Sequence, residues 1–256
     1  MPSRAIQRLE SLLQSRQLDN TLAGRLPRAD EGVLATGIQP LDAQLEGGWP
    51  QGAVSEVVGP RSSGRTSVLV ATLAAATRRG GLVGLVDAFD RFDPVTAARA
   101  GVDLDRVLWV RGQALGEAGE PARRAGQTSS RRAGEAVLRA IRALDLIIRA
   151  GGFAVAALDL GEAPPRAIVA LPFTTWLRLA HANEGRRTCV LLLGKAPMGR
   201  SARGRSIRVQ PCPCWSGTHA QSRRFEGFEV GARGGLTATT NVRAHAESEG
   251  AEPVGP

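Results

Sequence analysis

One glycine-rich segment, Gly59-Pro-Arg-Ser-Ser-Gly-Arg-Thr66, constrains the fold of this chain more than any other stretch. The β-branched residues Val54, Val57 and Val58 before it predict a buried strand, and the apolar sequence after it predicts a helix over residues 67–80. In such a strand–loop–helix unit, glycines let backbone N–H groups turn inward, and the helix dipole adds positive potential. The segment therefore predicts an anion site within an α/β fold.

The loop departs from the phosphate-binding pattern G-x-x-x-x-G-K-[ST] at one position, where Arg65 replaces the lysine. A lysine ammonium is compact, whereas a guanidinium is a wide planar fork that does not fit the same space. Nucleotide binding through the backbone and Thr66 stays open, but hydrolysis depends on charge placement around the γ-phosphate and is expected to suffer. A chance turn in a chain with 31 glycines is the alternative. The loop residues assigned to nucleotide binding are Gly59, Pro60, Arg61, Ser62, Ser63, Gly64, Arg65, Thr66 and Ser67.

The composition favours a polyanionic partner. The chain has 256 residues, 43% of them hydrophobic, which is enough for one core, and a formal net charge of +9. The basic residues are nearly all arginine, and Lys195 is the only lysine. The chain has three cysteines and shows no secretory leader, which predicts a protein of the reducing cytoplasm. No apolar run approaches membrane-spanning length. Cys212 and Cys214 lack the paired spacing of zinc ligands, and their role stays open.

The chain is expected to have three parts. Residues 3–18 predict an amphipathic helix with Ile6, Leu9 and Leu13 on one face, followed by a polar linker to Gly32. Such a helix cannot bury its stripe alone, so it docks either on its own domain or on another protomer or partner. The parts are a helix and linker over 1–32, a core over 33–230, and a tail over 231–256 that is expected to be disordered.

Several segments resemble the opening of a RecA-type core, with similar motifs at comparable spacings. The resemblance is strong to Val110, weakens towards Val230, and implies a central, mostly parallel sheet flanked by helices. Within the RecA group, the short length and the missing motor residues look most like ImuA, a RecA-related protein of bacterial mutagenesis cassettes. The matching segments are residues 36–42 (TGIQPLD), 47–52 (GGWPQG), 56–66 (EVVGPRSSGRT), 82–88 (LVGLVDA) and 93–108.

The resemblance also implies that the ATP-hydrolysing residues have been lost. Phe89 stands where RecA has the glutamate that activates the attacking water, and a phenylalanine cannot accept a proton. An alignment slip of one residue would instead bring Asp90 to that position. The fifth expected strand, over 188–193, ends in Gly194-Lys195 rather than in the asparagine–glutamine pair that senses the γ-phosphate.

An aspartate ends the fourth expected strand, Phe153-Ala-Val-Ala-Ala-Leu-Asp159. Ligands of open α/β sheets bind at the carboxyl ends of the strands, where Asp159 would emerge. By resemblance, Asp159 and Thr66 would hold Mg²⁺ if ATP binds. The alternative is an aspartate that caps the following loop.

Basic residues after the fifth strand suggest contact with DNA. We expect helices over 131–150 and 166–182, a loop from Met198 to Ser222, and a strand over 224–230. The loop corresponds to the second DNA-contacting loop of RecA, and arginines interleaved with an aromatic residue suit single-stranded DNA. A charged loop without a ligand is the alternative. The candidate DNA-binding residues are Arg200, Arg203, Arg205, Arg208 and Trp215.

Three hypotheses about function follow from the resemblance. The first is a RecA-like adaptor in SOS-type translesion mutagenesis that binds RecA, ImuB, an error-prone polymerase or DNA, with little or no ATP hydrolysis. The second is an ATP-dependent DNA-binding recombinase or damage sensor of the RecA kind. The third is a cell-division inhibitor similar to SulA, which the basic loop mildly disfavours.

Overall fold

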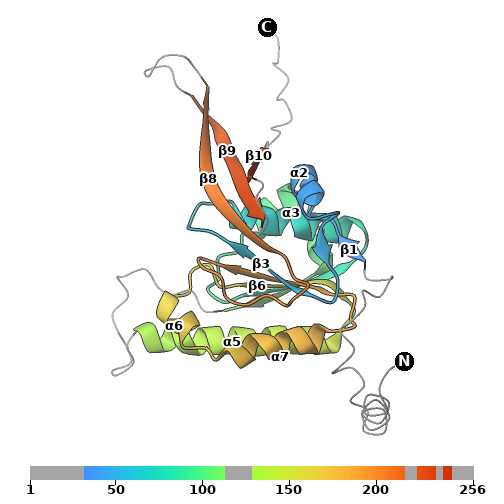
Figure 1. The fold of residues 1–256 in the computed structure, drawn as a ribbon, viewed down its shortest axis with the longest axis vertical. Helices are drawn as coiled ribbons and strands as arrows, with labels where there is room; N and C mark the ends of the chain where they lie inside the picture. The colour runs from blue at the N-terminus through green and yellow to red at the C-terminus, as the bar shows by residue number, and fades with distance from the viewer. Residues whose placement is uncertain (1–31, 113–128, 217–223, 235–238, 244–256) are drawn as a thin grey trace, which may run out of the picture. The chain divides into compact units, whose positions relative to one another are not determined.

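The computed structural model describes residues 32–112, 129–216, 224–234 and 239–243 (Figure 1). The chain divides into two units, Met1–Glu31 and Gly32–Pro256. The expected N-terminal helix lies outside the described residues, so the description below concerns the second unit. In the described part, no helix is both long and apolar enough to span a membrane.

The second unit is built on an eight-stranded sheet with the order β10-β9-β8-β3-β7-β6-β4-β5. The six strands from β8 to β5 are parallel to their neighbours, whereas β9 and β10 are antiparallel. This topology confirms the α/β fold with a mostly parallel sheet. The strands are β3 (Val54–Val58), β4 (Leu82–Asp87), β5 (Val107–Arg111), β6 (Phe153–Asp159), β7 (Cys189–Gly194), β8 (Ser206–Ser216), β9 (Arg224–Gly234) and β10 (Thr239–Arg243).

Helices cover both faces of the parallel strands (Figure 1). Buried residues of α2, α3 and α4 form one hydrophobic cluster with one face of the sheet, and those of α5 and α7 form a second cluster with the other face. The helices are α2 (Gln39–Gln44), α3 (Arg65–Arg78), α4 (Pro94–Arg99), α5 (Ser129–Ala150), α6 (Pro165–Val169) and α7 (Phe173–Asn183). A 3₁₀ turn, η2 (Leu104–Arg106), precedes β5, and β1 (Val33–Leu34) pairs with β2 (Trp49–Pro50) in a separate small sheet.

The central strands read as continuous apolar runs because both of their faces are buried. In β3, Val57 packs in the cluster of α3 and Val54 in the cluster of α5. The strand period of two sends these side chains to opposite faces. This double burial explains why the strands at β3, β6 and β7 were predictable almost to the residue.

The helix expected over 166–182 is two helices. Pro172 is the N-cap residue of α7, and α6 ends at Val169 before it. Proline has no N–H and disfavours a helical conformation in the preceding residue, so it separates the two helices rather than kinking one.

The predicted loop over 198–222 is wrong for residues 206–216, which form β8. Ile207 and Val209 are buried while Arg208 and Gln210 are exposed, and this alternation is typical of a strand. Strand β8 pairs with β3 over Ser206–Arg208 and then continues beyond it against β9 (Figure 1).

The expected start of the tail at Gly231 also differs from the structure. Strand β9 extends to Gly234, and β10 follows it over Thr239–Arg243. Because β9 lies between β8 and β10, it is not an edge strand. Pairing with a distant strand gives regular structure to residues whose own sequence has no clear period.

Candidate phosphate-binding site

The loop between β3 and α3 is fixed at both ends by backbone hydrogen bonds. The N–H of Gly59 donates to the carbonyl of Gly194 at 3.0 Å, and the N–H of Val68 donates to the carbonyl of Gly64 at 3.0 Å. Gly64 is the N-cap of α3 with φ of 91°, a conformation that favours glycine. Helix α3 has 14 residues and begins at Arg65, two residues before the predicted start. The loop therefore presents a helix N-terminus at the carboxyl end of a central strand.

Two buried polar groups of this loop lack a hydrogen-bond partner. The Ser63 side chain is 2% exposed and its Oγ is unpaired, and Arg65 is 9% exposed with its Nη1 unpaired. Buried polar groups are nearly always paired, so each exception needs an explanation. Both are donors placed around a helix N-terminus, the arrangement expected of a site that receives an anion.

The guanidinium of Arg65 lies against the backbone of Gly161, just after β6. A Cβ at position 161 would meet Nη1 at 2.6 Å and both Cζ and Nη2 at 2.9 Å. Only glycine leaves room for the fork in this position. Arg65 thus reaches from the start of α3 to the carboxyl end of β6, with β7 between β3 and β6 in the sheet.

Aspartates end the two adjacent strands β4 and β6, and Asp159 of β6 lies two residues before Gly161. Asp87 of β4 and Asp159 of β6 are paired in register, so their side chains leave the same face of the sheet. Asp159 Oδ1 accepts a hydrogen bond from the N–H of Gly161 at 2.7 Å. Burial raises the pKa of Asp159, and the Gly161 hydrogen bond and the charge of Arg65 partly oppose this shift. Thr66, the other expected Mg²⁺ ligand, is exposed in the first turn of α3.

Phe89 points into the core and not into the crevice. It is 1% exposed and packs in the cluster of α5 and α7. The neighbouring Asp90 forms two hydrogen bonds of 2.9 Å with Arg111, and these hold the pKa of Asp90 below its usual value. Phe89 thus brings no proton acceptor to the crevice, and the Asp90 carboxylate is engaged by Arg111.

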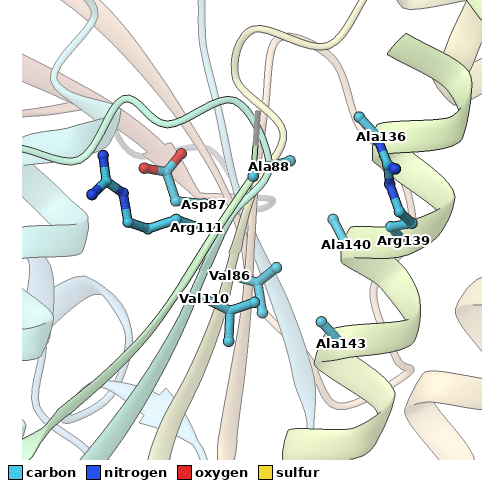
Figure 2. Close-up of a pocket in the computed structure, with 10 residues that line it drawn as sticks. Val86, Asp87, Ala88, Val110, Arg111, Ala136, Arg139, Ala140 and Ala143 are labelled. Atoms are coloured by element: carbon cyan, nitrogen blue, oxygen red, sulfur yellow. The ribbon is translucent and has the colours of Figure 1, made fainter. Parts of the chain in front are cut away.

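A pocket of about 270 Å³ lies at the ends of β4 and β5, separate from the loop. Figure 2 shows Val86, Val110 and Ala88 on its strand side and three alanines of α5 opposite them. Asp87 and Arg111 point away from α5. The strand side chains that face α5 are therefore apolar, α5 itself adds Arg139 to its alanines, and none of the lining residues belongs to the phosphate loop. The α5 residues that line it are Ala136, Arg139, Ala140 and Ala143.

The segment after β7 is fixed to β3 rather than extended into solvent. Glu56, 3% exposed in β3, accepts hydrogen bonds from the Met198 N–H at 3.0 Å and from the Ser206 hydroxyl at 2.7 Å. Lys195, which follows the end of β7, is exposed. The sequence analysis missed the role of Glu56, although a glutamate inside an apolar strand was a signal that it needs buried partners.

The structure brings the candidate DNA-binding arginines together only in part. Arg205 forms an ion pair with Glu46, and Arg200 donates to the Gly204 carbonyl at 3.4 Å. Arg203 is exposed, and so is Arg208, which lies in β8 opposite Val58. The backbone of Trp215 pairs with Phe225 in the hairpin, and its side chain lies outside the described residues, as do those of Cys212 and Cys214.

Comparisons with known proteins agree with this geometry over part of the chain. Residues 20–122 match the family described as RecA N-terminal domain. Over 76 residues the chain is 47% identical to Protein RecA of Synechococcus sp. (strain WH7803), which is 30% of this chain and 20% of that protein. Over 73 residues it is 48% identical to Protein RecA of Prochlorococcus marinus (strain MIT 9303), which is 28% of this chain and 19% of that protein. The matches thus span about a fifth of these relatives and support a RecA-like family.

Proposed function

We propose that this protein is a RecA-like adaptor in the DNA damage response that hydrolyses little or no ATP. More specifically, the protein acts in SOS-type translesion mutagenesis, as ImuA-like proteins do. It binds RecA, ImuB, an error-prone polymerase or DNA. The partial similarity to RecA and the sheet order support the scaffold. The identity of the partners comes from the resemblance alone.

The observation that carries the proposal is the position of Phe89. At the place where a RecA-type ATPase needs a general base, this chain buries an aromatic ring in its core. Asp90, the nearest carboxylate in the sequence, is held by Arg111. The crevice therefore keeps groups that suit an anion, Ser63 and Arg65, while position 89 offers no carboxylate to activate water.

Nucleotide binding is part of the proposal, because the loop fits a phosphate chain. The RecA family generally binds ATP with Mg²⁺, and the unpaired buried donors at Ser63 and Arg65 suit phosphate oxygens. A bound nucleotide that is not turned over would order the crevice and the segment after β7, which Glu56 links to β3. Such an adaptor responds to nucleotide occupancy rather than to hydrolysis.

The test is phosphate release in the presence of ATP, Mg²⁺ and single-stranded DNA, with RecA as the positive control. We expect release at the level of a Gly64→Asp variant, in which a side chain is placed on the positive φ of the loop. Turnover near that of RecA, lost in the variant, would favour the recombinase hypothesis instead.

DNA binding is tested separately by fluorescence anisotropy with labelled single strands at several salt concentrations. Arg200, Arg203 and Arg208 are changed together to glutamate. Each lost phosphate contact should lower the slope of log K against log salt by about 0.7. If the altered and unaltered proteins bind equally, these arginines are not the DNA surface. The matched control changes three exposed arginines elsewhere to glutamate: Arg79, Arg91 and Arg99.

Partner binding is tested by co-purification of the full chain with RecA, with ImuB and with the cell-division GTPase in parallel. Capture of RecA or ImuB is the expected result. Capture of the division GTPase alone would support the SulA-like alternative.

A further inference from the structure

The guanidinium of Arg65 lies at the end of β6 that carries Asp159, one of the two expected Mg²⁺ ligands. In phosphate-loop proteins, Mg²⁺ bridges the phosphate oxygens, the hydroxyl after the loop lysine and a strand-end aspartate, and it neutralises charge there. Here the equivalent hydroxyl and carboxylate are those of Thr66 and Asp159. The fork of Arg65 rests on Gly161, two residues beyond Asp159, at the same end of the sheet.

The charges around this position are already balanced in part by the arginine. Asp87 and Asp159 leave the sheet side by side, and two neighbouring carboxylates need a cation nearby to stay ionised together. Arg65 is buried with its guanidinium against Gly161, two residues beyond Asp159, whereas Arg111 lies beside Asp87 (Figure 2). A guanidinium keeps its charge at any pH that proteins tolerate, so the charge of Arg65 is permanent.

The donor set of the crevice fits phosphate better than it fits a divalent ion. Phosphate oxygens need N–H and O–H donors, and Arg65 Nη1 and Ser63 Oγ are buried donors without partners. A divalent ion needs oxygen ligands, and Asp159 and Asp87 each already spend part of their acceptor capacity on a backbone N–H, that of Gly161 and that of Phe92. A second cation would also be repelled by the fixed guanidinium.

We propose that Arg65 supplies the charge neutralisation that Mg²⁺ supplies in related sites, so that the crevice binds the phosphate chain of a nucleotide without a divalent ion. One arginine then replaces both the loop lysine and the metal. Gly161 is the positioning residue, because it makes the space in which the fork lies. The inference rests on the nucleotide site of the proposed function and specifies how that site works.

The test is the titration of the full chain with a fluorescent ATP analogue and with its diphosphate counterpart, each in excess Mg²⁺ and in excess EDTA. The expected dissociation constants in EDTA lie within about threefold of those in Mg²⁺. Arg65→Ala should abolish binding in EDTA. Arg65→Lys should bind only with Mg²⁺, because one compact ammonium lacks the second arm with which the guanidinium reaches Gly161 while its other N–H groups stay free for phosphate.

Two glycine variants test whether binding depends on where the Arg65 guanidinium lies and not only on its being there. In Gly161→Ala, the new Cβ would meet Nη1 at 2.6 Å, so the fork must move, and binding in EDTA should weaken by more than about tenfold. Gly134→Ala is the matched control, because nothing lies within 4 Å of its Cβ, and it should bind like the unaltered chain. Urea unfolding of each variant verifies that it is folded.

Three results would overturn the inference. Saturable binding that is lost in EDTA would show a metal-dependent site and would leave the proposed adaptor function intact. Unchanged binding in Gly161→Ala would mean that the fork need not lie on Gly161. No binding in either condition would remove the nucleotide site altogether, whereas the adaptor function would still be judged by phosphate release and partner capture.

Discussion

The carboxylate of Glu56 accepts a 2.7 Å hydrogen bond from the hydroxyl of Ser206, and this joins the strand before the phosphate loop to the first residue of β8. The same carboxylate accepts from the Met198 N–H at 3.0 Å, so one buried side chain fixes both ends of the connection from β7 to β8. Val54 and Ser55 of β3 are also hydrogen-bonded to this connection, at Ser201 and Arg205, so Glu56 adds a buried carboxylate to a set of backbone links.

Glu56→Ala should destabilise the protein by about 1–3 kcal/mol, because it leaves the Met198 N–H and the Ser206 hydroxyl without their partner. The measurement is urea unfolding. Glu56→Gln should recover most of the loss, because its amide accepts from Met198 and donates to Ser206. Glu46→Ala is the surface control, and it should cost about 0–1 kcal/mol, since the Glu46 side chain is 78% exposed. Equal effects of Glu56→Ala and Glu46→Ala would contradict the role assigned to Glu56.

Asp159→Asn should stabilise the protein at neutral pH. Burial raises the pKa of Asp159 in the folded state above its usual 3.8, so the ionised carboxylate costs stability once the pH exceeds that value. The cost grows until the pH passes the folded-state pKa and is absent below pH 3.8. Unfolding free energies from acid to neutral pH should therefore show an advantage of the variant that disappears on acidification. A constant difference at all pH values would contradict this origin.

Asp90→Asn is a control in which the change in unfolding free energy should have the opposite sign. The Arg111 hydrogen bond lowers the pKa of Asp90, so its ionised form stabilises the fold above the usual value and this contribution is lost as the pH falls through the folded-state pKa. The variant should be less stable than the unaltered chain at neutral pH, and the two should converge in acid. The same direction of change in both variants would rule out the proposed electrostatics.

Phe89→Ala should cost about 3–5 kcal/mol, because it removes a fully buried ring from the cluster of α5 and α7. Phe173→Ala, whose ring is 66% exposed, should change stability by less than about 0.5 kcal/mol. Thermal and urea unfolding compare the two. Phe89→Glu should not create ATPase activity, because its carboxylate would enter an apolar core and destabilise it. Hydrolysis in that variant would show that position 89 reaches the crevice.

The thiol of Cys189 should be inert in the folded protein. Burial raises its pKa to about 12, and the side chain lies in the core beside the Trp49 carbonyl. Only the thiolate reacts with Ellman's reagent, so a chain with Cys212→Ser and Cys214→Ser should react only after denaturation. Rapid reaction of the native chain would show that β7 opens readily.

Much of the fold could be predicted from the sequence because the relevant patterns are local. The valines of β3, the apolar run that ends at Asp159 and the turn before α3 lie within short windows, and a strand or a helix start depends mainly on such windows. Strands β8 and β10 were missed, whereas β9 was predicted from its first residue and ended four residues too early. Their pairing joins distant segments, and the alternation around Ile207 is short.

The sequence alone determined that this chain has buried strands, a glycine-rich loop before a helix and no lysine in that loop, because periodicity and residue identity suffice for those statements, and the motif resemblance added the mostly parallel sheet. Only the tertiary structure decided where three side chains lie. Arg65 lies on Gly161, Phe89 lies in the core and Glu56 holds the connection to β8. These directions depend on contacts between residues far apart in the chain, which packing fixes and no short window of sequence contains.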